Sequence, residues 1–175
     1  TDETIFFLNL KKTIKMISEL SINEFHRTLN EMTVEGTPSY KGSFFAFFTI
    51  NFSNKPFYGY VSKSEFAISK NSNIKLVPFT IRGNYKKNGD KTEVDYEIQP
   101  IKFGNYWIKF MPISVLLISI FLFLLNINNK DFVNSQLIIF ILFTLFFSIF
   151  ANVDLYLKKK NFEKLFLKTL KINNI

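Results

Sequence analysis

The sequence predicts a mixed α+β fold: an N-terminal antiparallel sheet with one amphipathic helix, then a two-helix transmembrane hairpin, then a C-terminal amphipathic helix. Three observations carry this prediction. Short segments that alternate polar and apolar residues fill the first half of the chain, two long uncharged runs follow, and the last residues put apolar and basic side chains on opposite sides of a helix. We therefore divide the chain into a sheet domain at residues 1–106, a hairpin at 107–156 and a basic helix at 157–175.

The first expected elements are a strand and a helix. Residues 13–17 alternate polar and apolar side chains, which is typical of a strand. Ser21 is followed three residues later by Glu24, the spacing of a capping box at a helix start. Apolar residues then recur at helical spacing on one face, at Ile22, Phe25, Leu29 and Met32. We expect an amphipathic helix over residues 22–32.

The rest of the first half reads as antiparallel sheet. Strands are expected at residues 44–52, 57–62, 66–69, 76–85 and 92–98. Asn88-Gly89 is the strongest hairpin-turn signal in the chain. In the last strand Val94, Tyr96 and Ile98 alternate with Glu93, Asp95 and Glu97, which predicts one buried and one wet face. Gly59, inside a strand, predicts a bulge or the close approach of another backbone.

Two apolar runs predict the hairpin. Residues 110–129 and 132–153 are 20 and 22 residues long and carry no charge, and roughly 20 helical residues cross a hydrocarbon core of about 30 Å. The alternative, a buried core of a soluble protein, requires a polar stripe on the face that meets water, and neither run has one. We expect spans at about 108–127 and 133–154, made antiparallel by the short polar link at residues 128–131.

Aromatic and basic residues flank the two runs, as they do at the two boundaries of a bilayer. We assign the following residues to the membrane interface: Trp107, Lys109, Tyr156, Lys158, Lys159 and Lys160. The segments before and after the hairpin have an excess of basic residues, whereas the link has one Lys and one Asp. Because basic segments stay on the cytoplasmic side, we expect both termini in the cytoplasm.

Small polar residues inside the spans mark faces where helices approach closely. These candidate helix-packing residues are Ser114, Ser119, Thr144, Ser148 and Asn152. One interpretation is packing of the two spans against each other. The other is docking of the second span to another membrane subunit.

The C-terminal residues form an amphipathic helix in this interpretation. Its apolar side has Phe162, Leu165, Phe166 and Leu170, and Lys residues dominate its other side. This helix continues the second span, lies in the membrane interface, or covers the apolar face of the sheet. We favour the sheet, because its apolar face needs a cover.

The sequence offers no catalytic constellation. His26 is the single His and there is no Cys, so we expect no zinc site and interpret His26 as a surface or capping residue. Glu93, Asp95 and Glu97 share one wet face, whereas catalytic carboxylate pairs need different environments. No phosphate-binding glycine motif, no nucleophile motif and no charge within the spans is present. We expect a non-enzymatic protein without cofactor or metal; an enzyme would need a pocket that unites Asp95 or Glu97 with His26.

Three short motifs occur in a characteristic order: Phe57-Tyr58-Gly59, Phe66-Ala67-Ile68, and Pro78 followed by Gly83. With the hairpin and two spans that follow, over roughly residues 13–170, the chain resembles a group of small uncharacterised bacterial membrane proteins that have a cytoplasmic sheet and a two-span hairpin. The resemblance implies this architecture and a bacterial inner membrane, and no activity. The layout also resembles membrane-tethered modules of the bacterial pleckstrin-homology type.

These observations lead to two hypotheses of function. The first is an inner-membrane accessory or interaction subunit of unknown biochemical activity, with the lipid bilayer and a protein partner or a second copy as its contacts. The second is a membrane-tethered module that contacts lipid. The net charge of +8 suits membrane orientation, because its basic residues gather beside the spans, and we expect no nucleic acid partner.

Overall fold

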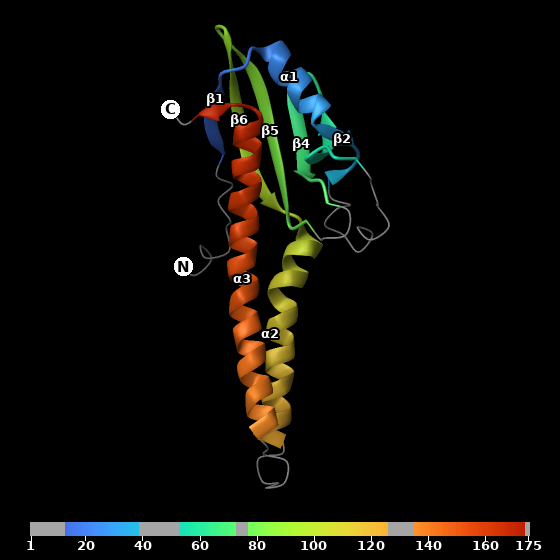
Figure 1. Cartoon of the computed structure of the whole chain (residues 1–175), viewed down its shortest axis with the longest axis vertical. Helices are drawn as coiled ribbons and strands as arrows, with labels where there is room; N and C mark the ends of the chain where they lie inside the picture. Colours follow the sequence, from blue (N-terminus) through green and yellow to red (C-terminus); the bar gives the residue numbers. More distant parts are fainter. Residues whose placement is uncertain (1–12, 39–52, 73–76, 126–134, 174–175) are drawn as a thin grey trace, which may run out of the picture.

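The computed structural model describes residues 13–38, 53–72, 77–125 and 135–173. The strand predicted at residues 44–52 and the link at 128–131 lie outside these ranges. Figure 1 shows a curved sheet at one end of an elongated molecule and a helical hairpin at the other. The longest helix belongs to both parts.

The sheet has seven strands among the described residues, in the order β2-β3-β4-β5-β6-β1-β7. Their bounds are Ile14–Ser18 (β1), Thr33–Glu35 (β2), Phe57–Val61 (β3), Glu65–Lys70 (β4), Phe79–Asn88 (β5), Lys91–Pro100 (β6) and Ile172–Asn173 (β7). All neighbours pair antiparallel except β2 and β3, which are parallel. The prediction of an entirely antiparallel sheet built from N-terminal residues alone is therefore wrong at both edges of the sheet. Helix α1 leads from β1 to β2 at the other edge of the sheet, where β2 lies parallel to β3, and β7 comes from the end of the chain.

The hairpin predicted at Asn88-Gly89 is confirmed. Asn88 pairs with Lys91, so Gly89 and Asp90 form the two-residue connection between β5 and β6. Gly89 has φ 61°, the positive value that a tight hairpin turn needs at its first central position.

Gly59 confirms the expected close approach of another backbone. A Cβ atom at this position would lie 2.1 Å from the carbonyl oxygen of Ala67 on β4. Gly59 pairs directly with Ile68, so the strand continues there without a bulge.

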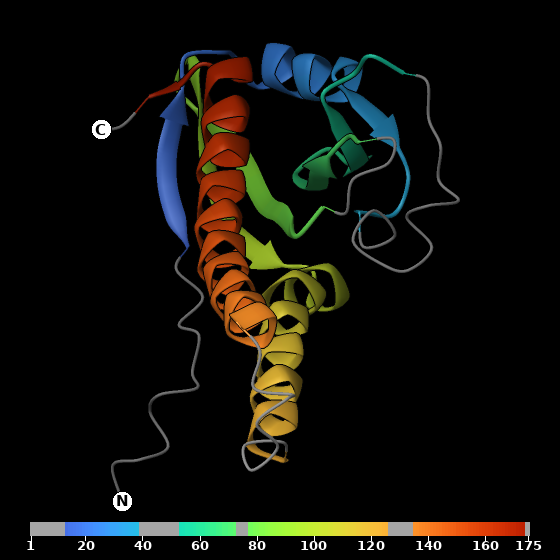
Figure 2. The same cartoon turned by 60° about the horizontal axis from the view of Figure 1, so that its bottom comes forward.

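Helix α1, Ile22–Glu31, begins with the predicted capping box. The Ser21 hydroxyl accepts the Glu24 N–H, and the Glu24 carboxylate accepts the Ser21 N–H at 3.0 Å. These bonds and the nearby Arg27 lower the pKa of Glu24, the hydrogen bonds with Ser21 having the larger effect. The helix lies across one face of the sheet and buries Phe25 and Leu29 against it (Figure 2).

Helix α2, Lys102–Leu125, leads away from the sheet, and α3, Ser135–Thr169, returns beside it and continues along the sheet (Figures 1 and 2). The C-terminal residues thus do two of the three things considered above: they continue the second apolar run and they cover the sheet. Both α2 and α3 are long and apolar enough to cross a membrane.

The hydrophobic core lies between the sheet, α1 and the C-terminal half of α3. Phe166 is its centre, with no exposed surface and with ring centroids 5.5 Å from Phe66 and 5.2 Å from Tyr96. Tyr85 on β5 contacts Phe25 of α1 with centroids 4.9 Å apart. The sheet and the end of α3 are therefore one folding unit.

Candidate functional site

The exposure of apolar side chains is inverted along α3. In the half that lies beside α2, large apolar residues are exposed, including Phe146 at 65%, while Thr144, Ser148 and Ala151 are buried. In the half that lies beside the sheet, Phe162, Phe166 and Leu170 are buried and lysines are exposed. The change falls near Asp154 and Leu155.

The buried small residues lie where α2 and α3 pack together. Ser119 on α2 and Thr144 on α3 are buried, and each hydroxyl donates a hydrogen bond within its own helix. Ser119 donates to the Val115 carbonyl at 2.7 Å, and Thr144 donates to the Ile141 carbonyl at 2.9 Å. The Ser148 hydroxyl is buried without a hydrogen-bond partner. For Ser119, Thr144 and Ser148, the burial favours the first interpretation, in which the two spans pack against each other.

Two of the five predicted helix-packing residues have a different position. Ser114 and Asn152 are exposed. Ser114 donates to the carbonyl of Phe110 at 3.0 Å, and the Asn152 amide donates to the carbonyl of Ser148 at 2.9 Å. Their outward position leaves both available to a neighbouring molecule.

The residues assigned to the membrane interface gather near the junction of hairpin and sheet. Trp107 is exposed and stacks on Phe103, with centroids 5.9 Å apart. Trp107 and Asp154 line one hollow of about 310 Å³ between α2 and α3, so they lie at the same level. Lys158 pairs with Asp154 at 2.5 Å. The remaining members are exposed: Lys109, Tyr156, Lys159 and Lys160.

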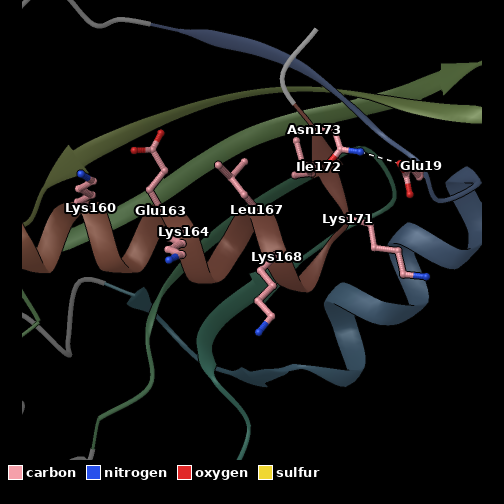
Figure 3. A pocket seen from close by; sticks show the side chains of 9 residues that line it. All are labelled: Glu19, Lys160, Glu163, Lys164, Leu167, Lys168, Lys171, Ile172 and Asn173. Atoms are coloured by element: carbon pink, nitrogen blue, oxygen red, sulfur yellow. Dashed lines mark hydrogen bonds between the residues drawn. The ribbon is translucent and has the colours of Figure 1, made fainter.

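An open groove of about 590 Å³ runs along the exposed side of α3 (Figure 3). We call it the lysine groove, after Lys160, Lys164, Lys168 and Lys171, which line it. Glu19 and Glu163 also line it, so four cations face two carboxylates. Leu167, Ile172 and Asn173 complete it.

Both carboxylates in the groove already have partners. Glu163 accepts the Tyr96 hydroxyl at 2.9 Å, and Glu19 accepts the Asn173 amide at 2.6 Å. Burial, and secondarily Glu163, raises the pKa of Tyr96. Within the described part of the chain, none of the four groove lysines has an ion pair. The groove therefore presents a net positive charge to water.

The end of the groove is fixed by the return of the chain into the sheet. Lys171 has φ 47°, a left-handed conformation at the C-terminus of α3 that favours glycine. The Ser18 hydroxyl donates to the Leu170 carbonyl at 2.5 Å, and Glu19 N–H donates to the Lys171 carbonyl at 3.1 Å. These long-range bonds tie the helix end to β1.

The predicted carboxylate face lies on the side of the sheet opposite the helices. Glu93 pairs with Lys86 at 3.0 Å, and this hydrogen bond raises the pKa of Lys86. Asp95 lies opposite Lys15 in the register, and Glu97 lies opposite Arg82. Of the three carboxylates, only Glu93 forms an ion pair among the described residues; Asp95 Oδ1 is buried without a hydrogen-bond partner, and Glu97 accepts the Gln99 amide.

His26 bridges α1 and the sheet. Its Nδ1 lies 2.6 Å from the Tyr85 hydroxyl, which donates its own proton to the Ser62 carbonyl. The Tyr85 hydroxyl therefore lies between His26 of α1 and the Ser62 carbonyl. This contact, which the sequence did not predict, lies on the helix-covered side, away from Asp95. Among the described residues no group of three His, Asp or Glu could hold a metal ion.

Comparison with known proteins does not assign the chain to a family. No family model matches the chain, and neither curated proteins nor solved structures give a significant match. The function of the chain is therefore inferred from the arrangement, burial and charge of its own residues.

Proposed function

We propose that the chain is an integral membrane protein whose sheet domain serves as a non-enzymatic interaction module on the aqueous side. The observation that carries this proposal is the inversion of exposure along α3. A helix in water hides its apolar side, as the second half of α3 does. The exposed phenylalanines of the first half need a hydrocarbon environment, which a bilayer supplies.

The continuity of α3 determines the position of the sheet domain. A helix rises about 1.5 Å per residue, so Lys164 stands about 15 Å beyond Asp154. Phe162 and Phe166 pack into the sheet core, and the domain therefore cannot turn freely on its anchor. Lys164, Lys168 and Lys171 of the lysine groove therefore stand clear of the bilayer, whereas Lys158, Lys159 and Lys160 lie close to it.

We infer that the lysine groove binds an acidic segment of a protein partner. Its four lysines face two carboxylates that have partners of their own, so an incoming carboxylate meets a net positive surface. Complementary charge of this kind steers association and selects against basic partners. The accessory-subunit role follows from this contact, and a second copy of the chain is the other occupant to consider.

The membrane we propose is the bacterial inner membrane, with the sheet domain and both termini in the cytoplasm. The excess of basic residues on both sides of the hairpin supports this orientation.

A photocrosslinking residue placed at Lys164 in the full-length chain tests the groove. We expect an adduct on an acidic segment of one partner, and loss of that adduct when Lys168 is changed to Glu. The matched control replaces Lys87, an exposed residue near the β5–β6 turn, and should give no such adduct. Equal adducts at both positions, or adducts on basic segments, would contradict the assignment.

The alternative function, a lipid-contacting module, has one specific observation in its favour. It is a small pocket at the edge of the sheet from which α2 departs, lined by Lys70 and Lys158 among other residues.

A further inference from the structure

We propose that this pocket binds the phosphate group of an anionic membrane lipid. We call it the membrane-edge pocket; its volume is about 110 Å³ and it lies between the start of β5, the end of β4 and α3. Lys70, Ser72, Lys158 and Asn161 bring polar groups to it, and Phe79 and Phe162 are among its apolar walls. The proposal goes beyond the interaction module and rests on the membrane insertion proposed above.

The register of the sheet places the pocket at the membrane side of the domain. Phe79, the first residue of β5, pairs with Pro100, the last residue of β6. Helix α2 begins at Lys102, two residues after Pro100, so this edge of the sheet faces the hairpin. Ser69 pairs with Thr80, which brings the end of β4, and therefore Lys70, to the same edge.

Helix α3 brings the second lysine to this level. Asp154 shares a hollow with Trp107, one of the residues at the boundary of the apolar zone. Lys158 lies one helical turn further along and is held by Asp154 at 2.5 Å. The pocket thus opens at the height where lipid headgroups meet the protein.

The chemistry of the lining suits the headgroup end of a lipid. An ammonium group has three donors, so Lys158 keeps donors for an anion while it pairs with Asp154. Lys70 is exposed and has no ion pair within the described residues. The walls are mostly apolar, with Val77, Phe79 and Phe162 buried. Apolar walls beside two lysines favour a phosphate that carries hydrocarbon over a free phosphate ion.

The size of the pocket limits what enters it. A volume of about 110 Å³ accommodates a phosphate with its nearest substituents, and the acyl chains must remain outside. Outside the pocket lies the apolar surface of the hairpin, where exposed side chains such as Phe150 can contact those chains. Basic pockets beside transmembrane helices bind anionic headgroups in this way.

Native mass spectrometry of the full-length chain tests the proposal. The protein is released from micelles that contain equal amounts of phosphatidylglycerol and phosphatidylcholine. We expect one phosphatidylglycerol to be retained in preference to phosphatidylcholine, and Lys70→Gln to lower that retention about fivefold. Lys63→Gln is the matched control, because Lys63 is an exposed lysine two residues before β4, beyond the end opposite Lys70, and its replacement should leave retention unchanged.

A second arm distinguishes the source of the phosphate. Inorganic phosphate in large excess should not displace the retained lipid; displacement would assign the site to free phosphate and overturn the proposal. Equal retention of the two lipids, or an equal loss in Lys63→Gln and Lys70→Gln, would overturn it as well. Lipid retention is measured on protein already inside the micelle, and membrane insertion is measured separately by extraction of native membranes with alkali. A failure of one proposal can therefore be distinguished from a failure of the other.

Discussion

The two halves of α3 use the same residue types in opposite ways. Phenylalanine is exposed in the half beside α2, as at Phe146, and buried in the half beside the sheet, as at Phe166. Thr144 and Ser148 are buried in the first half, whereas lysines occupy exposed positions of the second half. One continuous helix therefore follows two packing rules.

The proposed membrane insertion explains this difference, because it changes the solvent that surrounds the helix along its length. In water, burial of apolar surface stabilises the fold, and the second half of α3 obeys that rule. Between helices in lipid the hydrophobic drive is absent, and small residues that allow close approach occupy the contact. Asp154 and its partner Lys158 lie where one rule gives way to the other.

The largest expected effect on stability comes from replacing phenylalanine with alanine, and it should differ between the two halves of α3. Phe166→Ala should lower the free energy of unfolding by about 3–5 kcal/mol, because it leaves a cavity in the sheet core. Phe146→Ala should lower it by less than about 1 kcal/mol in detergent, since an exposed side chain leaves no cavity. Thermal unfolding of the full-length protein followed by circular dichroism measures both. Equal losses of unfolding free energy in the two variants would contradict the difference between the two halves of α3.

The next effect concerns the contact between α2 and α3. Ser148→Leu should destabilise the hairpin by about 1–3 kcal/mol through overpacking. Ser148→Ala should change its stability by less than about 0.5 kcal/mol, because the buried hydroxyl has no hydrogen-bond partner to lose. Unfolding in a mild detergent titrated with a denaturing one measures the series. Ser114→Leu is the control, since Ser114 is exposed; a loss as large as that of Ser148→Leu would place the helix contact elsewhere.

A smaller effect on stability is expected in the sheet domain, at Tyr85. Burial raises the pKa of Tyr85 from its usual 10.0 to about 12. The folded state then holds this proton more tightly than the unfolded state, so stability is full below about pH 10 and falls as pH rises towards about 12. Tyr85→Phe should cost about 1 kcal/mol at neutral pH through its lost hydrogen bonds with Ser62 and His26. It should also make the alkaline fall less steep, and an unchanged slope in denaturant titrations at several pH values would refute this.

The smallest effect has the opposite sign. Lys171→Gly should stabilise the protein by about 0.5–1 kcal/mol, because glycine adopts a φ near 47° without steric cost. A higher thermal midpoint in circular dichroism is the expected result. A lower midpoint would mean that the Lys171 side chain contributes more to the end of α3 than its backbone conformation costs.

Local signals in the sequence predicted the local structure. The capping box at Ser21 and Glu24 and the turn at Gly89 depend on neighbouring residues, and both are confirmed. The parallel pairing of β2 with β3 was not predicted, because three residues are too few to show the pattern of a strand or to indicate its partner. Strand β7 was missed for the same reason, since two residues carry no periodicity.

One candidate site could be predicted from the sequence and the other could not. The lysine groove could be anticipated, because Lys160, Lys164 and Lys168 recur at helical spacing on one side of the predicted C-terminal helix. The membrane-edge pocket could not, since Lys70 and Lys158 meet only after the sheet register and α3 bring distant segments together. The contact of His26 with Tyr85 is of this second kind.

Spin-label accessibility along α3 tests the central claim most directly. The chain contains no Cys, so single labels at Phe146→Cys and Lys164→Cys report on one exposed position in each half. In liposomes that contain the full-length protein, we expect the label at position 146 to be relaxed by oxygen and shielded from a water-soluble nickel complex. The label at position 164 should show the reverse. Equal access of the nickel complex to both positions would contradict a membrane-spanning first half of α3.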